Sequence, residues 1–284
     1  MSNVPSIGIN IVETLPNVQN VGEGSRFVVS VPTGVKALKA VGLELSGTTF
    51  NSSHVDTLEV LANGKPLMQY REAAHLENLQ GYYGVNVATG RLLVDFDRKH
   101  LTQALDREKF LLGLADVSTL QIQGNIAGST APAVSAYEQK TALRKPDDKA
   151  EQVRRRNQLG LFTKVKNFVY TLSGAGTTEI DNIPREAWLQ AMHLIQSADV
   201  VTNVEVWVDG RKVWDASKAR MEQVCEDAGR TRQAATYHID WMLENELGGQ
   251  LPLAGVQDFR LKIEHSGAAT LSVYAEYLSS FSGI

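Results

Sequence analysis

The chain has 284 residues, of which 43% are hydrophobic and 21% charged, with a formal net charge of −4 and a mean hydropathy of −0.18. This composition is typical of a soluble globular protein with one large or two ordinary domains, and the negative charge disfavours a dedicated nucleic-acid binder. The single cysteine, Cys225, excludes an intrachain disulfide framework and a cysteine-rich zinc module. Neither a secretory signal nor a transmembrane helix is expected, because no charged-then-apolar leader and no long apolar run occurs.

The first half of the chain alternates apolar and polar residues as β-strands do. Strands are predicted over 27–31, 35–45, 91–96, 115–122 and 133–137, a hairpin over 58–68 and a short helix over 71–80, with Gly81 ending it. The leucine-rich connection after residue 96 is a second helical candidate. Asn63-Gly64 at the centre of the hairpin suits a two-residue type I′ turn, because both residues tolerate positive φ.

The second half repeats this order, and its clearest mark is the stretch 204–214, V-E-V-W-V-D-G-R-K-V-W. Glu205 matches Glu59, Val206 matches Val60, and Asp209-Gly210 matches Asn63-Gly64. A helix with Asp215 as N-cap and Gly229 as C-cap follows, with apolar positions at Ala219, Val224 and Ala228. Further strands are predicted over 236–241, 254–261 and 271–277. Two hairpins in matching places indicate that the protein is a duplication.

The segment 187–195 is ambiguous when it is taken alone. Trp188, Ala191, Met192 and Ile195 fall at helical spacing after Pro184, which favours a helix. Its counterpart in the first half is the strand predicted over 35–45. Because a duplicated architecture constrains both copies, we expect a strand here.

The many short strands and turn residues in each half predict an all-β fold of two tandem jelly-roll β-sandwiches (a double jelly roll) with short helical insertions. The expected organisation is a first jelly roll over 1–145, a charged linker over 146–160 and a second jelly roll over 161–284. Arg154-Arg155-Arg156 in the linker could contact phosphate. The neighbouring acidic residues Asp147, Asp148 and Glu151 favour a solvated segment instead.

The second half also resembles the major capsid proteins of the corticoviruses, which are icosahedral, lipid-containing bacteriophages. The resemblance rests on V-E-V-W-V-D-G and on four further segments: G-T-T-E-I (176–180), T-Y-H-I-D-W-M-L-E (236–244), V-Q-D-F-R-L-K-I-E (256–264) and V-Y-A-E-Y-L (273–278). It covers most of residues 174–280, and the first half matches only through its strand pattern.

The resemblance implies a coat protein of the adenovirus–tectivirus lineage. Three copies would form a homotrimer whose six jelly rolls give a pseudo-hexagonal capsomer, and these capsomers would tile a capsid around an internal membrane. Expected partners are other copies of the chain, penton proteins and membrane-associated virion proteins, with peripheral contact to the internal membrane and no specific nucleic acid. Such a protein is part of the virion capsid and is assembled in the cytoplasm of a bacterial host.

The search for catalytic residues predicts no enzyme. The six histidines are scattered singly, which disfavours the metal site of a cupin, and no Gly-x-Ser-x-Gly nucleophile elbow occurs. Gly174-x-Gly176 lacks the third glycine or the Gly-Lys-Ser/Thr of a phosphate loop. No cofactor is required.

Calcium is the one ion for which the sequence offers ligands, because carboxylate oxygens suit it. The candidates are Asp95 and Asp97 in the first half, and Asp240, Glu244 and Glu246 in the second. The simpler interpretation is that these are charges at strand ends and in loops.

All four tryptophans, Trp188, Trp207, Trp214 and Trp241, lie in the second half. They are expected in the core or at subunit interfaces. Trp207 lies on the strand face opposite the valines, so we expect a helix, the other jelly roll or a neighbouring subunit to cover it.

The alternative function is a spike-like jelly-roll module that binds carbohydrate or a receptor. Such a module needs exposed aromatic platforms in loops, whereas these tryptophans lie in predicted strands.

Overall fold

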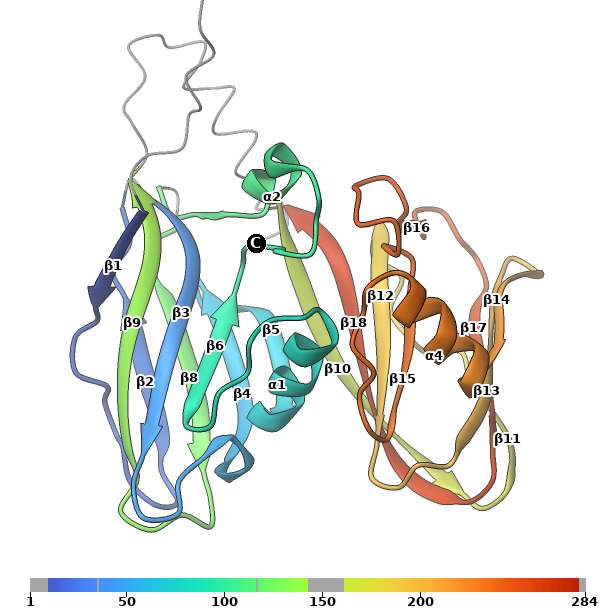
Figure 1. Ribbon diagram of the computed structural model, residues 1–284, viewed down its shortest axis with the longest axis horizontal. Coiled ribbons are helices and arrows are strands. Elements are labelled where there is room, and N and C mark those ends of the chain that lie inside the picture. The colour runs from blue at the N-terminus through green and yellow to red at the C-terminus, as the bar shows by residue number, and fades with distance from the viewer. Residues whose placement is uncertain (1–9, 35, 116, 143–160, 281–284) are drawn as a thin grey trace, which may run out of the picture. The chain divides into compact units, whose positions relative to one another are not determined.

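The structure is a computed structural model that describes residues 10–34, 36–115, 117–142 and 161–280 (Figure 1). The predicted linker, 146–160, lies outside these residues. Two compact units are present: unit 1 contains the described residues of Met1–Glu77, Asn86–Thr163 and Ser279–Ile284, and unit 2 contains Asn78–Val85 and Lys164–Leu278. A short segment from the first half of the chain is thus part of unit 2.

Unit 1 is a sandwich of two antiparallel sheets. Its elements are β1 (Asn10–Thr14), β2 (Arg26–Val31), β3 (Lys36–Ser46), η1 (Ser52–His54), β4 (Val55–Ala62), β5 (Lys65–Glu72), the first residues of α1 (Ala73–Tyr82), β6 (Arg91–Asp95), α2 (Ala104–Lys109), β7 (Leu112–Gly113), β8 (Leu120–Ile126) and β9 (Ala133–Ala142). The residues of α1 from Asn78 on belong to unit 2. One sheet has the order β1-β9-β3-β6, with β7 also paired to β3, and the other contains the run β5-β4-β8-β2.

Unit 2 has the same construction. Its elements are β10 (Leu161–Ser173), β11 (Gly176–Ile180), β12 (Trp188–Gln196), β13 (Val201–Val208), β14 (Arg211–Ser217), α4 (Lys218–Asp227), β15 (Thr236–Asp240), β16 (Leu251–Pro252), β17 (Phe259–His265) and β18 (Ala268–Ser280). Its sheets are β15-β12-β18-β10, with β16 paired to β12, and β11-β17-β13-β14.

The two units share one strand order, since β10-β18-β12-β15 corresponds to β1-β9-β3-β6 and β11-β17-β13-β14 to β2-β8-β4-β5. Register agrees as well: Ala40 is opposite Asp95 in unit 1, and Ala191 is opposite Asp240 in unit 2. The predicted duplication and the double jelly roll are confirmed.

Both predicted hairpins are present, and their turn residues have positive φ, 51° and 77° at Asn63-Gly64 and 45° and 76° at Asp209-Gly210. The first turn residue has a second role that is the same in both units. The side chain of Asn63 accepts hydrogen bonds from the backbone N–H groups of Ser118 and Thr119, and that of Asp209 accepts from Gln257 and Asp258. Each side chain thereby fixes the residues just before β8 or β17.

These contacts account for a shared error in the strand predictions. β8 begins at Leu120 and β17 at Phe259, whereas strands were predicted to begin at Ala115 and Ala254. Shortly before each strand a backbone N–H donates to the carbonyl three residues earlier, Val117 to Leu114 and Val256 to Leu253, as in a turn. The alternation of apolar and polar residues continues by chance into the stretches before β8 and β17. Periodicity alone therefore places the start of each strand too early.

The segment 187–195 is a strand, as the duplication predicted: β12 lies in the middle of its sheet, between β15 and β18. Its residues are almost all buried on both faces, which explains why no clear alternation is present.

The helix predictions need three corrections. α1 runs through Gly81 to Tyr82, so Gly81 does not end it. The N-cap of α4 is Ser217, whose side chain accepts from the Arg220 N–H, and not Asp215. Met221 and Cys225 form the buried face of α4, whereas Ala219 and Val224 are exposed. No helix in the described part of the chain is both long and apolar enough to span a membrane.

The core of unit 2 lies between its two sheets. The inward side chains of β13, Val204 and Val206, pack with Leu261 of β17 and with Leu194 and Val273 of the facing sheet, and all are fully buried. Unit 1 buries Phe27, Val55 and Ile122 in the same way.

Replacing Gly124 of β8 with alanine is expected to lower the free energy of unfolding by about 1–3 kcal/mol, because overpacking a rigid core costs that much. A Cβ there would lie 2.7 Å from the Phe27 ring and 2.8 Å from Val55, which are both fully buried. Chemical denaturation measures the change. Gly174→Ala is the control, since no atom lies within 4 Å of that Cβ; equal losses in both variants would contradict the prediction.

Candidate functional site

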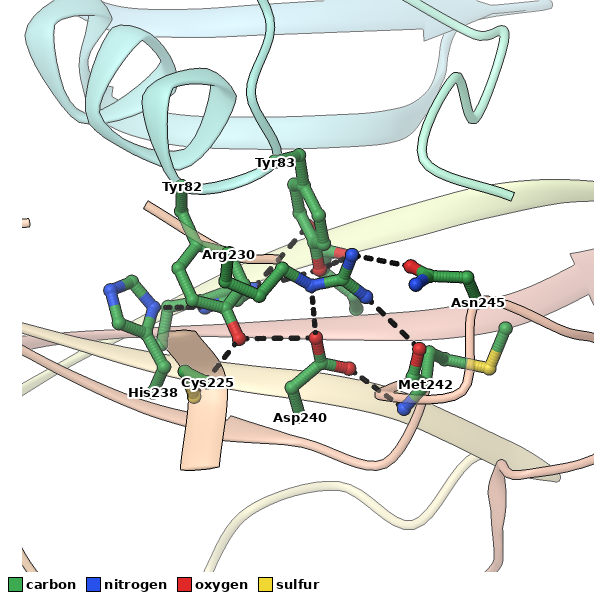
Figure 2. A network of polar contacts seen from close by, with 10 residues as sticks. Tyr82, Tyr83, Cys225, Arg230, His238, Asp240, Met242 and Asn245 are labelled. Atoms are coloured by element: carbon green, nitrogen blue, oxygen red, sulfur yellow. Dashed lines mark hydrogen bonds and ion pairs between the residues drawn. The ribbon is translucent and has the colours of Figure 1, made fainter. Parts of the chain in front are cut away.

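A network of buried polar side chains lies in unit 2, on the face of the β15-β12-β18-β10 sheet that is opposite the sandwich core (Figure 2). Tyr237 and Ile239 of β15 belong to the core, so the alternation of the strand turns His238 and Asp240 to the other side. There the segment Asn78–Val85 and the residues after α4 cover them. The network is therefore inside unit 2 and next to its apolar core, to which the network residues Tyr82 and Cys225 also belong.

The first part of the network is an ion pair between Arg230 and Asp240. Their side chains are 2% and 0% exposed, and Arg230 Nε lies 2.9 Å from Asp240 Oδ2. The other guanidinium nitrogens of Arg230 donate to Asn245 Oδ1 and to the Met242 carbonyl, at 2.5 and 3.0 Å. Burial by itself lowers the pKa of Arg230, but the Asp240 carboxylate outweighs it, so the pKa lies above its usual value.

The second part is the pair Tyr82 and Tyr83 at the end of α1. Tyr82 is fully buried, and its hydroxyl lies 3.1 Å from Asp240 Oδ2 and 3.3 Å from Cys225 Sγ. Tyr83 donates to Glu276 Oε2 of β18 at 3.0 Å. The Thr231 N–H also donates to the Tyr82 carbonyl at 3.0 Å. These contacts bind a segment of the first half of the sequence into unit 2.

The third part is a pair of histidines on adjacent strands. His193 of β12 and His238 of β15 are 0% and 2% exposed, and their Nδ1 atoms lie 2.8 Å apart. One Nδ1 must donate and the other accept. His193 Nε2 lies 3.3 Å from the Tyr83 hydroxyl, whose own proton is donated to Glu276, and 3.6 Å from Glu276 Oε1. Both neighbours therefore favour a proton on Nε2 of that ring. His238 is then the donor.

This assignment leaves His238 Nε2 as a buried acceptor with no hydrogen-bond partner among the described residues. The Tyr82 ring stacks on the His238 imidazole at 3.8 Å between centroids, with 17° between the planes. Burial lowers the pKa of His238 well below its ordinary value, and the neighbouring His193 lowers it further. The neutral ring is the stable form.

Unit 1 has apolar residues in place of the histidines. The register that pairs Ala40 with Asp95 also pairs Gly42 with Leu93, at the positions that His193 and His238 occupy in unit 2. The aspartates agree between the units: Asp95 Oδ1 accepts from the Asp97 N–H at 3.0 Å, and Asp240 Oδ1 accepts from the Met242 N–H at 2.7 Å. The turn after the strand is shared, and the histidine pair belongs to unit 2 alone.

The five predicted calcium ligands fall into different surroundings. Arg107 binds the Asp97 carboxylate through two hydrogen bonds of 3.1 and 2.8 Å, and Lys99 lies 3.0 Å from Asp95. Burial raises the pKa of Asp95, while Lys99 lowers it in part. Asp240 is buried against Arg230, whereas Glu244 and Glu246 are exposed. The residues that the structure describes hold no group of three or more His, Cys, Asp or Glu side chains able to hold a metal ion.

Trp207 lies on the outward face of the β11-β17-β13-β14 sheet and is half-buried. Its indole N–H donates to Glu205 at 2.9 Å, and Lys212 Nζ lies 5.3 Å from the ring centroid. Beside it is an open hollow of about 240 Å³ lined by Glu179, Trp207, Arg260 and Lys262. Arg260 is already paired with Glu179 and Asp258. The other tryptophans differ in exposure: Trp188 is 45% exposed, and Trp214 and Trp241 pack against the core.

Little in the sequence indicates this network. Local pattern marks Asp240 only as a strand-end aspartate, and His193 and His238 only as isolated histidines. Tyr82 and Asp240 are 158 positions apart, and Tyr83 and Glu276 are 193 apart. The one usable signal is that the predicted strand T-Y-H-I-D contains two residues that can carry charge, His238 and Asp240. The structure buries this strand at every position.

Comparison with known proteins agrees with the fold. Models of the viral coat protein P2 N-terminal domain and of its C-terminal domain match residues 12–141 and 162–281. The major capsid protein P2 of Pseudoalteromonas phage PM2 is 26% identical over 276 residues, which covers 94% of this chain and 96% of that protein.

Solved structures extend the comparison. The crystal structure of the major capsid protein P2 from bacteriophage PM2 superposes with a TM-score of 0.84 at 25% identity, covering 96% of this chain and 98% of that one. A chain of Sulfolobus Turreted Icosahedral Virus has a TM-score of 0.70 at 13% identity, covering 95% and 91%, and one from the PBCV-1 virus capsid has 0.66 at 9%, covering 98% and 95%. These two show the fold alone. Because the two domain models together span most of the sequence, the chain belongs to the viral coat protein P2 family.

Proposed function

We propose that this protein is the major capsid protein of a bacteriophage and works by assembly, without catalysis. The observation that supports the proposal is the pair of jelly rolls with one strand order, in a chain that is 26% identical to a phage major capsid protein over nearly its whole length. Rigid sandwiches of this kind present fixed side surfaces, which is what a repeating lattice requires.

The proposed assembly unit is a homotrimer. Three chains contribute six jelly rolls of like topology, so a closed threefold ring has a pseudo-hexagonal outline and can tile a surface. In this proposal the capsomers surround an internal membrane, contact it peripherally, and meet penton and membrane-associated virion proteins. The protein is assembled in the cytoplasm of a bacterial host.

Calcium is a further part of the proposal, at a contact between copies. Arg107 and Arg230 already neutralise Asp97 and Asp240, so an ion there would have to displace an arginine. Glu244 and Glu246 are the candidates exposed to solvent, where a second copy could complete the coordination.

Purified full-length protein is expected to have a solution mass of about three times the 31.1 kDa of one chain and a six-lobed outline in electron micrographs. Light scattering after size exclusion measures the mass, with and without a calcium chelator. Dissociation by the chelator would support calcium at the contact, and an unchanged trimer would argue against it. A stable monomer at high concentration would contradict the assembly proposal.

The alternative, a carbohydrate-binding module, has less support, because the indole N–H of Trp207 and the nearby Arg260 are occupied by partners within the chain. Trp207→Ala separates the two functions. The capsid proposal expects no sugar binding in either protein, whereas sugar binding that is lost in Trp207→Ala would favour the alternative.

A further inference from the structure

Aromatic and acidic side chains enclose the histidine pair. The Tyr82 ring covers His238 (Figure 2), and the Tyr83 hydroxyl and Glu276 lie at His193 Nε2. Cys225 of α4 lies behind this cover, 3.3 Å from the Tyr82 hydroxyl. A proton can be added to the pair only at His238 Nε2, because the other ring nitrogens already hold protons or accept one. That atom is buried and faces no acceptor among the described residues.

The charges around the pair balance without an extra proton. Asp240 is paired with Arg230. Glu276 already accepts from Tyr83 and is the anion nearest His193. Lys218 of α4 is the remaining cation that acts on His238, and Glu222 and Asp199 lie beside it. An imidazolium at His238 would therefore be a buried charge. Among the described residues the anion that acts on it is Glu276, which Tyr83 and His193 already contact.

We propose that His193 and His238 hold the segment Asn78–Val85 in place at neutral pH and release it in acid. The neutral rings give Tyr82 a flat surface on which to stack and leave Glu276 to bind Tyr83. When His238 takes up a proton, the imidazolium must reach water. Tyr82 stacks directly on the ring and lies outside the strands, so Tyr82 and its neighbours are the cover that moves aside. Release of the segment exposes the ring and Cys225. Unit 1 has Gly42 and Leu93 at the equivalent positions, and neither of these residues can take up a proton.

The way in which release of the segment depends on pH follows from the pKa of His238 in the closed and the released state. In the released state His238 titrates near its ordinary pKa of about 6.5, and in the closed state its pKa lies well below that value. The segment is thus fully held above about pH 6.5. Below it, the released population grows about tenfold for each pH unit, until the pH falls to the pKa of the closed state.

The buried thiol of Cys225 reports the release, because it is 4% exposed, lies 3.3 Å from the Tyr82 hydroxyl and is the chain's only cysteine. The probe is 4,4′-dithiodipyridine, which reacts with thiols in acid, and each rate is divided by that of free cysteine at the same pH. Between about pH 7.5 and about pH 5 we expect the normalised rate for the full-length protein to rise about 30-fold. Tryptophan emission should stay unchanged, because the tryptophans lie outside the segment.

Two variants make the test specific. His238→Asn places an amide N–H near the position of Nδ1, where it can donate to His193, but does not titrate, so its labelling rate should be flat with pH. If that variant does not fold, His238→Leu, with the residue that unit 1 has there, takes its place. His265→Gln is the matched control, since His265 is also buried, on β17, and its variant should keep the acid response. The proposal is overturned by a flat wild-type rate, by an acid response that survives in the His238 variants, or by a rise that occurs only with a red shift of tryptophan emission.

Discussion

Replacing Arg230 with methionine should lower the free energy of unfolding of the second jelly roll by about 3–5 kcal/mol. The variant keeps the bulk of the side chain but leaves the Asp240 carboxylate, which is 0% exposed, without its cation. Among the residues that the structure describes, the Met242 N–H and the Tyr82 hydroxyl would remain as its partners. Chemical denaturation followed by tryptophan emission measures the loss, and it reports unit 2 selectively because all four tryptophans lie in it.

Two further variants test whether the loss comes from an uncompensated charge. Arg232→Met removes an arginine that is 61% exposed and lies 3.2 Å from Glu222, so it should cost less than about 1 kcal/mol. Adding Asp240→Asn to Arg230→Met removes the unpaired charge and should recover part of the loss. A double variant no more stable than Arg230→Met would show that packing, and not charge, accounts for the effect.

Replacing Tyr82 with alanine is expected to cost about 3–5 kcal/mol, the range for removing a large buried aromatic side chain. The ring is fully buried, stacks on His238 and packs with the unit 2 core. The cost should again be visible in tryptophan emission during denaturation. Cys225 should also react faster with thiol reagents at neutral pH, because the cavity exposes it.

Tyr82→Phe divides the effect into its two parts. It keeps the ring and removes the hydroxyl that contacts Asp240 and Cys225, so it should cost about 1–3 kcal/mol. Phenylalanine should also preserve the acid response of Cys225, because stacking on His238 is retained. A loss as large in Tyr82→Phe as in Tyr82→Ala would contradict the view that burial of the ring is the main contribution.

The coat-protein resemblance found in the sequence is confirmed by the two domain models, and so is the double jelly roll. The duplication decided between helix and strand for 187–195, which has helical spacing yet forms β12. Strand starts were less accurate. Turn side chains from a distant hairpin, Asn63 and Asp209, fix where β8 and β17 begin, and no local pattern contains that information.

What the sequence by itself determined is what depends on near neighbours: alternation places the strands, and Asn-Gly and Asp-Gly set the turns through backbone sterics. What only the tertiary structure decided is which polar groups meet. His193 and His238 are 45 positions apart, and Tyr82 and Asp240 are 158 apart, so no periodicity could pair them. Their meeting depends on strand register and on the packing of Asn78–Val85 into unit 2. Burial then converts two ordinary histidines into a pair that resists protonation, because the low-dielectric surroundings penalise the charged form.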